Sequence, residues 1–514
     1  MSDKNTPGMG FEVNIRSATS RQTGQITDVD TPFCMAVLGD FSGRFDQPMA
    51  DDKPLVQRKL ISVDRDNFDE VLASFQLNFD ICLSENPETP IHIEVNELDD
   101  FHPDALYQKL EIFSRLRDIR RRLQNKQSFD AAASEIMGWL VPQAAPQADT
   151  EQATQSTAPA PDVSGTELLD NILGSAQPSA TDQSAGQSVI EQLVKQVIAP
   201  YVEPSTNPRQ PEMLDAVDEA TAAHMRAILH HPRFQQLEAA WRSIYFLISR
   251  IATDSRLKIY LLDVSKPELQ ADLSGEVDVS AMHKRFCEPV MNDIPWSLLL
   301  GNYRFDDTID DALLLAQLGS IAQQAQAPFI AAAHETLAGC EGFGQYPDAD
   351  DWHYQMKPGA ANAWTLLRQE PGAAYLGLAL PRFLLRAPYG NKSAPIETFK
   401  FEEMPELCHE CFLWGNAAFI KAEQLARAFS NRHWNMQPGE AHQTENLPMY
   451  YFEQDGETAL FPCAEIYLTE KGGQRLSGQG LIPLWSVKNA DTIRSSDFNA
   501  LAADGSSLQG RWVR

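Results

Sequence analysis

The sequence predicts a mixed α/β protein made of two α/β lobes docked together, and three features support this fold class. Short segments that are continuously apolar, or that alternate apolar and polar residues, have the pattern of strands. Longer amphipathic segments lie between them, and this alternation is typical of mixed α/β architectures. A stretch rich in Ala, Pro, Gln, Ser and Thr, from Pro142 to Gly165, interrupts the pattern. Because it has no periodic apolar residues, we expect a disordered linker there.

The first lobe is expected to span residues 1–141. Residues 32–44 (PFCMAVLGDFSGR) form an apolar run that ends in a turn, which predicts a strand buried on both faces. Residues 103–123 are predicted to form one long amphipathic helix, rich in arginine toward its end. Residues 11–16 (FEVNIR) alternate like a half-buried strand. The apolar side chains of this strand are Phe11, Val13 and Ile15.

Beyond the flexible linker of residues 142–165, we expect short tethered helices in residues 166–210 and a second lobe in residues 211–514. In the second lobe, segments with the pattern of helices alternate with segments that have the pattern of strands. Its predicted helices are residues 211–251, broken near the middle, 310–326 and 416–429, and its predicted strands are residues 257–265, 296–305, 375–380 and 464–469.

The net charge of −29 argues against a nucleic-acid partner, because phosphate binding needs basic surfaces. The first ten residues lack the pattern of a secretory signal. The apolar runs are short and interrupted by charge, so we expect no membrane insertion. Seven scattered cysteines are typical of free thiols in a reducing compartment. A cytoplasmic location is therefore expected.

For each candidate catalytic or metal-binding motif, the pattern is either absent or better explained by a purely structural role of the residues. The sequence has neither a GxxxxGK[ST] phosphate loop nor a GxSxG nucleophile elbow. Cys408 and Cys411 have the spacing of half a zinc site, but further ligands at a suitable spacing are missing, which favours an inert loop. His230 and His231 precede Pro232 and favour a helix end over a metal pair. We expect no enzymatic activity, no cofactor and no metal.

Several long segments resemble the contractile sheath proteins of type VI secretion systems. Residues 11–140 are similar to the small sheath protein (TssB/VipA-like), through PFCMAVLGDFSGR, RKLISVDRDNFDEVL and IHIEVNELDDFHPDAL. Residues 166–509 are similar to the large sheath protein (TssC/VipB-like). That similarity lies in ILHHPRFQQLEAAWRSIYFLI, LKIYLLDVSKPEL, LLLGNYRF, APFIAAA, LGLALPRFLLRAPYG, FKFEE, LWGNAAFI and LIPL. The chain thus resembles a fusion protein of two subunits that are separate polypeptides in this family.

The resemblance implies a structural protein of protein secretion. In this family the two proteins pair, and the pairs stack into a cytoplasmic tube whose contraction drives an inner tube and spike outward. The partners implied are other sheath subunits, the inner tube protein, baseplate proteins and a ClpV-type AAA+ ATPase.

Two segments match interaction elements of the family. The ATPase recognises a short apolar helix, matched here by TELLDNILGS, with Leu168, Leu169, Ile172 and Leu173 at helical spacing. Packing of this helix onto its own lobe is the alternative. Residues 11–16 match a strand donated to a neighbouring subunit.

Two functions stay open at this point. The first is a fused small and large subunit that builds a contractile sheath. Relative to the family, the chain is expected to lack the usual C-terminal extension, whose strands tie neighbouring subunits together. The alternative is therefore a non-polymerising accessory protein that caps, initiates or docks the sheath at a baseplate or ATPase.

Overall fold

The computed structural model describes residues 28, 30–44, 54–83, 90–140, 210–288, 294–454 and 456–512. Helices and strands are mixed along both parts of the chain, which confirms the mixed α/β class. The predicted strand of residues 11–16, the linker of residues 142–165 and the segment with Leu168, Leu169, Ile172 and Leu173 lie outside the described residues.

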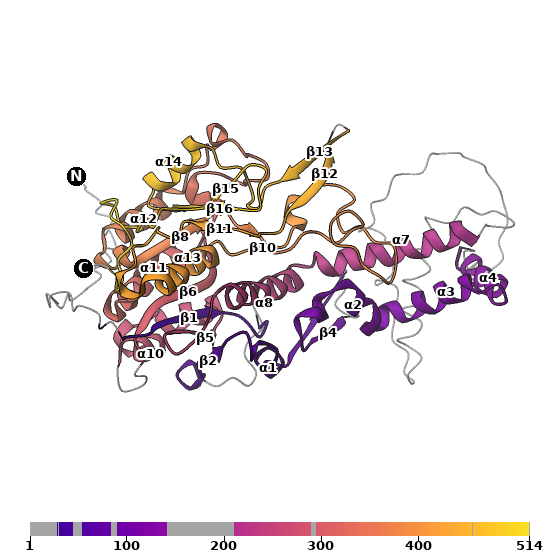
Figure 1. Ribbon diagram of the computed structural model, residues 1–514, viewed down its shortest axis with the longest axis horizontal. Helices are drawn as coiled ribbons and strands as arrows, with labels where there is room; N and C mark the ends of the chain where they lie inside the picture. The colour runs from indigo at the N-terminus through magenta and orange to yellow at the C-terminus, as the bar shows by residue number, and fades with distance from the viewer. Residues whose placement is uncertain are drawn as a thin grey trace, which may run out of the picture.

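A seven-stranded sheet lies inside the body at the left of Figure 1, and its strand order is β14-β8-β7-β6-β1-β5-β2. Its strands are β1 (Phe33–Gly39), β2 (Ile61–Val63), β5 (Leu257–Asp263), β6 (Trp296–Phe305), β7 (Phe329–Ala333), β8 (Leu376–Leu380) and β14 (Ile482–Pro483). Neighbouring strands are parallel, except that β2 runs antiparallel to β5. Every residue of β1, β7 and β8 is buried, as in parallel sheets covered on both faces.

Helices cover both faces of this sheet. The helices of the described residues are α1 (Phe68–Ser74), α2 (Pro103–Lys109), α3 (Ser114–Gln124), α4 (Phe129–Leu140), α7 (Gln210–Leu229), α8 (Pro232–Arg250), α9 (Lys266–Leu273), α10 (Ala281–Cys287), α11 (Ile309–Ala325), α12 (Pro358–Gln369), α13 (Ala418–Arg432) and α14 (Glu470–Gly478), and those that pack on the sheet include α8 and α13 on one face and α9, α10 and α11 on the other. Alternate residues of β1 enter two different cores. Phe33, Met35 and Val37 pack in one core with α8 and α13, and Cys34, Ala36 and Leu38 pack in the other with α9, α10 and α11.

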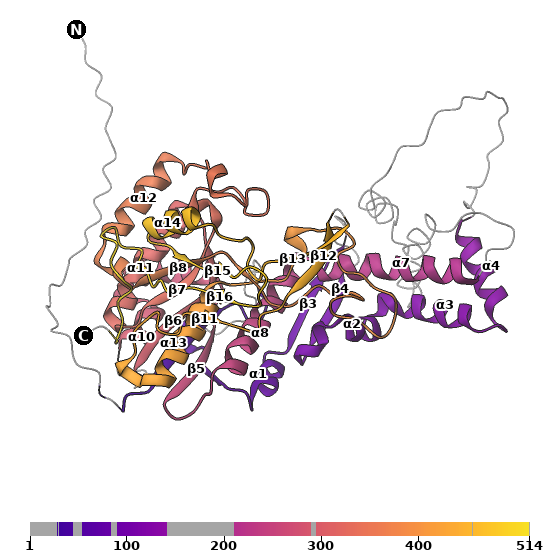
Figure 2. The same cartoon turned by 45° about the horizontal axis from the view of Figure 1, so that its top comes forward.

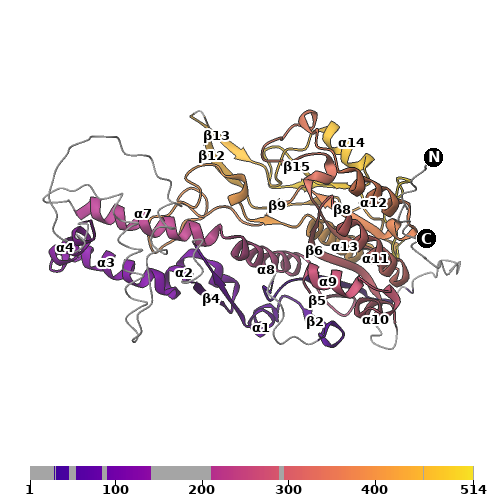
Figure 3. The ribbon, with the colours of Figure 1, turned by 180° about the vertical axis from the view of Figure 1, so that it is seen from behind.

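Smaller sheets surround the central one. They are β3 (Leu77–Ile81) with β4 (Ile91–Val95), β9 (Phe383–Leu384) with β10 (Trp414–Gly415), β11 (Gln443–Thr444) with β16 (Ile493–Arg494) and β15 (Trp485–Ser486), and the hairpin of β12 (Tyr450–Gln454) and β13 (Glu457–Phe461). The hairpin stands out from the body of the molecule (Figure 3).

An elongated arm leaves the sheet-containing body. In all three views α3 and α7 run side by side away from the sheet, with α4 at the far end (Figure 1, Figure 2). The 20 residues of α7 give it a length of about 30 Å. The predicted break in the helical region of residues 211–251 is confirmed, because α7 ends at Leu229 and Pro232 opens α8.

Two predicted elements are wrong in detail. The helix predicted for residues 103–123 is broken at Leu110, whose extended backbone separates α2 from α3. The break buries Leu110, Ile112 and Phe113 together, which a straight helix cannot do because residues two apart lie on nearly opposite faces. The strand predicted for residues 464–469 is reduced to one bridge between Phe383 and Ala464.

Candidate assembly interface

The segment before the predicted linker supplies a central strand to the sheet of the segment after it. Along β1, Phe33 pairs with Leu257 of β5, and the register continues to Gly39 opposite Asp263. On its other side β1 pairs with β6. Hydrogen bonds continue at both ends of this pairing, from the Phe33 amide to the Arg256 carbonyl (2.7 Å) and from the Val264 amide to the Gly39 carbonyl (2.8 Å). The two segments are therefore joined through a shared sheet as well as through packed surfaces.

An aromatic cluster adds to this shared sheet on the face covered by α8. Trp241 of α8 is fully buried, with its ring centroid 5.9 Å from that of Phe41, 6.0 Å from Phe68 and 5.0 Å from Phe75. Its indole N–H donates to the Phe41 carbonyl at 3.0 Å. All three partner rings come from the first segment. Since edge-to-face aromatic pairs add to the gain from burial, Trp241 is a principal anchor between the segments.

Ion pairs connect the segments at the carboxyl end of β5. Arg44 binds Asp263 at 2.6 Å and Glu268 at 3.2 Å, and Arg58 binds Glu268 at 2.7 Å. The side chains are 10–20% exposed, so solvent screens them only partly. Burial would raise the pKa of Glu268, but hydrogen bonds from Arg58 and the Ser265 amide, with the charge of Arg44, lower it to about 2. The pKa of Asp263 is raised, because burial outweighs Arg44 there.

A further ion pair lies in the arm. Arg120 of α3 donates two hydrogen bonds to the carboxylate of Asp218 on α7, at 2.6 and 3.2 Å. Such bidentate geometry fixes the rotation of one helix against the other. Of the arginines in the predicted Arg-rich helix, Arg120 contacts the second segment, whereas Arg122 pairs with Glu135 of the neighbouring α4.

Beside the shared sheet, a buried ion cluster ties α8 to the chain that follows β9. Arg386 binds Glu238 at 2.8 Å and Glu403 at 2.7 Å, and both carboxylates are at most 1% exposed. Burial opposes the charge of Glu403, but Arg386 and His230 lower its pKa to about 2. Removing one member would leave an uncompensated buried charge, which is costly. Sequence reasoning missed this cluster, and its only signal was a set of charges inside otherwise apolar segments.

Two family models match the chain over most of the described residues. Residues 211–500 match VipB, described as EvpB/VC_A0108, tail sheath N-terminal domain. The chain belongs to this sheath family. Residues 12–136 match the model of VipA of the type VI secretion system, described as VC_A0107 or Hcp2. This sheath protein therefore carries TssB-type and TssC-type domains of the type VI secretion system in one polypeptide, and these families are structural rather than enzymatic.

Curated sheath proteins of Pseudomonas aeruginosa are similar to each part. The type VI secretion system sheath protein TssC1 is 32% identical over 293 residues, covering 54% of this chain and 58% of TssC1. The sheath protein TssB1 is 30% identical over 101 residues, covering 19% of this chain and 57% of TssB1. The sheath protein thus spans somewhat more than half the length of each of these relatives.

The cysteines and histidines that the sequence analysis considered as metal ligands make structural contacts in the sheath protein. Cys408 and Cys411 are joined by a disulfide, so the prediction of free thiols is wrong for this pair. Within the described ranges, no group of three or more His, Cys, Asp or Glu could hold a metal ion. His231 caps α8 by accepting a hydrogen bond from the Arg233 amide at 3.3 Å, and His230 lies 3.6 Å from Glu403.

Among all the residues that the structure describes, no helix is long and apolar enough to cross a bilayer.

Replacing Trp241 by alanine is expected to lower the free energy of unfolding by about 3–5 kcal/mol, because the rings of three partners lose their contact and a cavity forms. Tyr245→Ala, four residues away on the same helix and 45% exposed, is the matched control and should cost about 1 kcal/mol. Urea unfolding with equal m values measures both. Equal losses for the two variants would show that Trp241 is no special anchor.

Acid is expected to weaken the ion pairs of Glu268. Because its folded pKa is about 2 and its ordinary value is 4.5, its stabilisation is present above pH 4.5 and is lost as the pH falls toward 2. The difference in free energy of unfolding between the unchanged protein and the Glu268→Gln variant should therefore fall by about 2 kcal/mol between pH 6 and pH 3. Urea titrations at both pH values measure this. An advantage that does not change with pH would contradict the assigned pairing.

Proposed function

We propose that this sheath protein is a building block of a contractile type VI secretion sheath, in which one polypeptide supplies a fused small and large subunit. The observation that carries this proposal is the position of β1 between β5 and β6. A strand inside a parallel sheet cannot leave without exposing the edges of both neighbours. The two parts therefore act as one unit with a fixed one-to-one ratio.

Assembly requires contacts between such units, and the proposed contacts come from segments outside the described residues. The strand with Phe11, Val13 and Ile15 would add to a sheet edge of a neighbouring unit by β-augmentation. Residues 142–165 would act as a flexible linker that leaves this pairing free of strain. The division into residues 1–141, 142–165, 166–210 and 211–514 belongs to the same proposal.

The proposed partners are copies of this chain or separate TssB-like and TssC-like subunits, packed around an inner tube on a baseplate in the cytoplasm. The apolar positions Leu168, Leu169, Ile172 and Leu173 would form a helix for the groove of a ClpV-type AAA+ ATPase. The net charge of −29 supports protein partners with basic surfaces rather than nucleic acid.

Electron micrographs of the purified full chain test the building-block function. We expect rings or tubes from the unchanged chain, and their loss in Val13→Asp, which puts a charge on the apolar face of the donated strand. Asn14→Asp, on the opposite face, is the matched control and should leave assembly intact.

Monomers or dimers at all concentrations would contradict the building-block proposal. If tagged protein then bound only at one end of a sheath made by a separate TssB and TssC pair, the accessory function would replace it. Incorporation along the whole tube would support the building block.

A further inference from the structure

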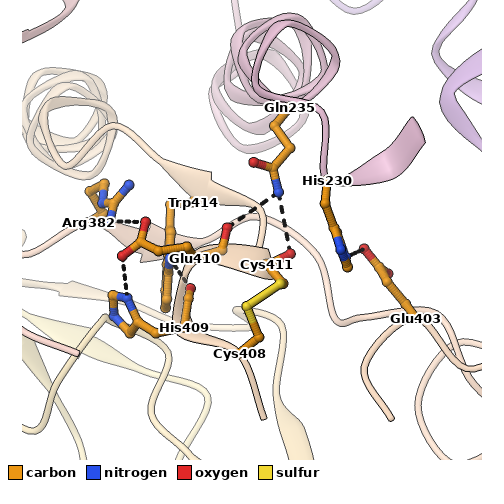
Figure 4. Close-up of a disulfide and its surroundings, with 9 residues drawn as sticks. All are labelled: His230, Gln235, Arg382, Glu403, Cys408, His409, Glu410, Cys411 and Trp414. Atoms are coloured by element: carbon orange, nitrogen blue, oxygen red, sulfur yellow. Dashed lines mark hydrogen bonds and ion pairs between the residues drawn. A yellow bond between two sulfur atoms is a disulfide. The ribbon is translucent and has the colours of Figure 1, made fainter. Parts of the chain in front are cut away.

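We propose that Cys408 and Cys411 are a reversible thiol–disulfide pair whose state controls how firmly the β12–β13 hairpin is attached to the body. This modification site is separate from the assembly proposed above. The two Cα atoms are 5.2 Å apart, and the sulfur atoms are bonded across His409 and Glu410 in a turn of 3₁₀ helix (Figure 4). Both cysteines are partly exposed, so a small thiol or disulfide can reach them.

This pair differs chemically from three other described cysteines, Cys34, Cys287 and Cys463. Burial raises the pKa of Cys34 and Cys463 to about 11 and that of Cys287 to about 12. Because the thiolate is the reactive form, these buried thiols are poor partners in exchange. Among the cysteines that the structure describes, Cys408 and Cys411 are the two that are bonded to each other.

The bridged turn positions the residues that hold the hairpin. The carbonyl of His409 accepts a hydrogen bond from the indole of Trp414 at 2.9 Å. Phe412, directly after the bridge, stacks on Phe461 of β13 with ring centroids 4.4 Å apart and meets Tyr450 of β12 at 5.5 Å. Any change in the path of the turn therefore moves the ring on which both strands rest.

The turn is also fastened to the large helix α8. Gln235 donates to the carbonyls of Glu410 and Cys411 at 3.5 and 3.4 Å (Figure 4). These bonds are long, so they do not hold the turn firmly by themselves. The disulfide is the covalent restraint that keeps the carbonyls in place. Opening it leaves a four-residue turn without a covalent restraint, held by the bonds from Gln235, by the indole of Trp414 on the His409 carbonyl and by the ion pair of Arg382 with Glu410 at 3.7 Å.

The hairpin depends on this support because it consists of only two short strands, β12 and β13. In the described residues β12 and β13 pair only with each other, and a two-stranded hairpin is marginally stable in water. Its ion pair between Lys392 and Glu453 is exposed and contributes little. Between the hairpin and the turn lies an open groove of about 440 Å³, lined by Leu407 and His409 on the side of the turn and by Phe452, Leu460 and Phe461 on the side of the hairpin.

The chemistry balances with glutathione disulfide as the oxidant. One cysteine thiolate attacks a sulfur of glutathione disulfide and releases one glutathione thiolate. The second cysteine attacks the mixed disulfide, forms the Cys408–Cys411 bond and releases the second glutathione. Both thiol protons end on glutathione, which is reduced while the protein is oxidised. In a reducing compartment, disulfides of this kind are usually transient and redox-sensing.

The test uses the full chain, equilibrated with dithiothreitol or with glutathione disulfide. Differential alkylation followed by mass spectrometry reports whether Cys408 and Cys411 are protected. Hydrogen exchange reports the opening of residues 450–454 and 457–461. We expect protection only after oxidation, and exchange of the hairpin about tenfold faster in the reduced protein. Exchange in β1 and β5 should stay the same, because the bridge closes only a local turn.

Two variants sharpen the test. The double variant Cys408→Ser with Cys411→Ser should exchange like the reduced protein whatever the oxidant. Cys82→Ser, a partly exposed free cysteine elsewhere, is the matched control and should keep the full redox response. Failure of glutathione disulfide to protect the pair would overturn the proposal. Protection without any change in hairpin exchange would overturn it as well, and both readings need only the unchanged chain.

Discussion

The pairing of β1 with β5 and β6 is the constraint on which the rest of the molecule depends. A parallel sheet buried on both faces has no solvent to satisfy the amide and carbonyl groups of an unpaired strand. Removing β1 would expose such groups on both neighbours and would open both hydrophobic cores, because alternate β1 side chains fill each core. The first and second segments of the sheath protein therefore complete one fold.

The charged contacts have a different role from the strand. A buried ion pair gains little net stability, because desolvation offsets much of the attraction between its charges. The pairs of Arg44 and Arg58 with Asp263 and Glu268, however, penalise any arrangement that separates the two segments. In the arm, the ion pair of Arg120 with Asp218 likewise penalises any separation of α3 from α7. Apolar burial supplies most of the stability, and these pairs select one register and one angle between the segments.

Much of the fold was predictable because strand and helix periodicities survive in the sequence. The apolar run of β1 predicted a fully buried strand, and the structure confirms it. Side-chain contacts between residues far apart in the sequence produce no such periodicity, so they could not be predicted. Where alternation had predicted a strand over residues 464–469, the chain makes one bridge from Ala464 to Phe383, and Glu465 forms an ion pair with Arg382. The ion cluster of Arg386 and the closure of Cys408 on Cys411 likewise depend on tertiary contacts, which periodicity does not record.

Cutting the polypeptide between the two segments measures this dependence most directly. A protease site inserted after Gln155, in the proposed linker, would allow cleavage of the folded protein, and gel filtration under native conditions then reports whether the pieces remain together. Because β1 is hydrogen-bonded on both sides, the two pieces should elute as one complex and separate only in denaturant. Two pieces that elute apart, each with its native circular dichroism, would contradict the shared sheet.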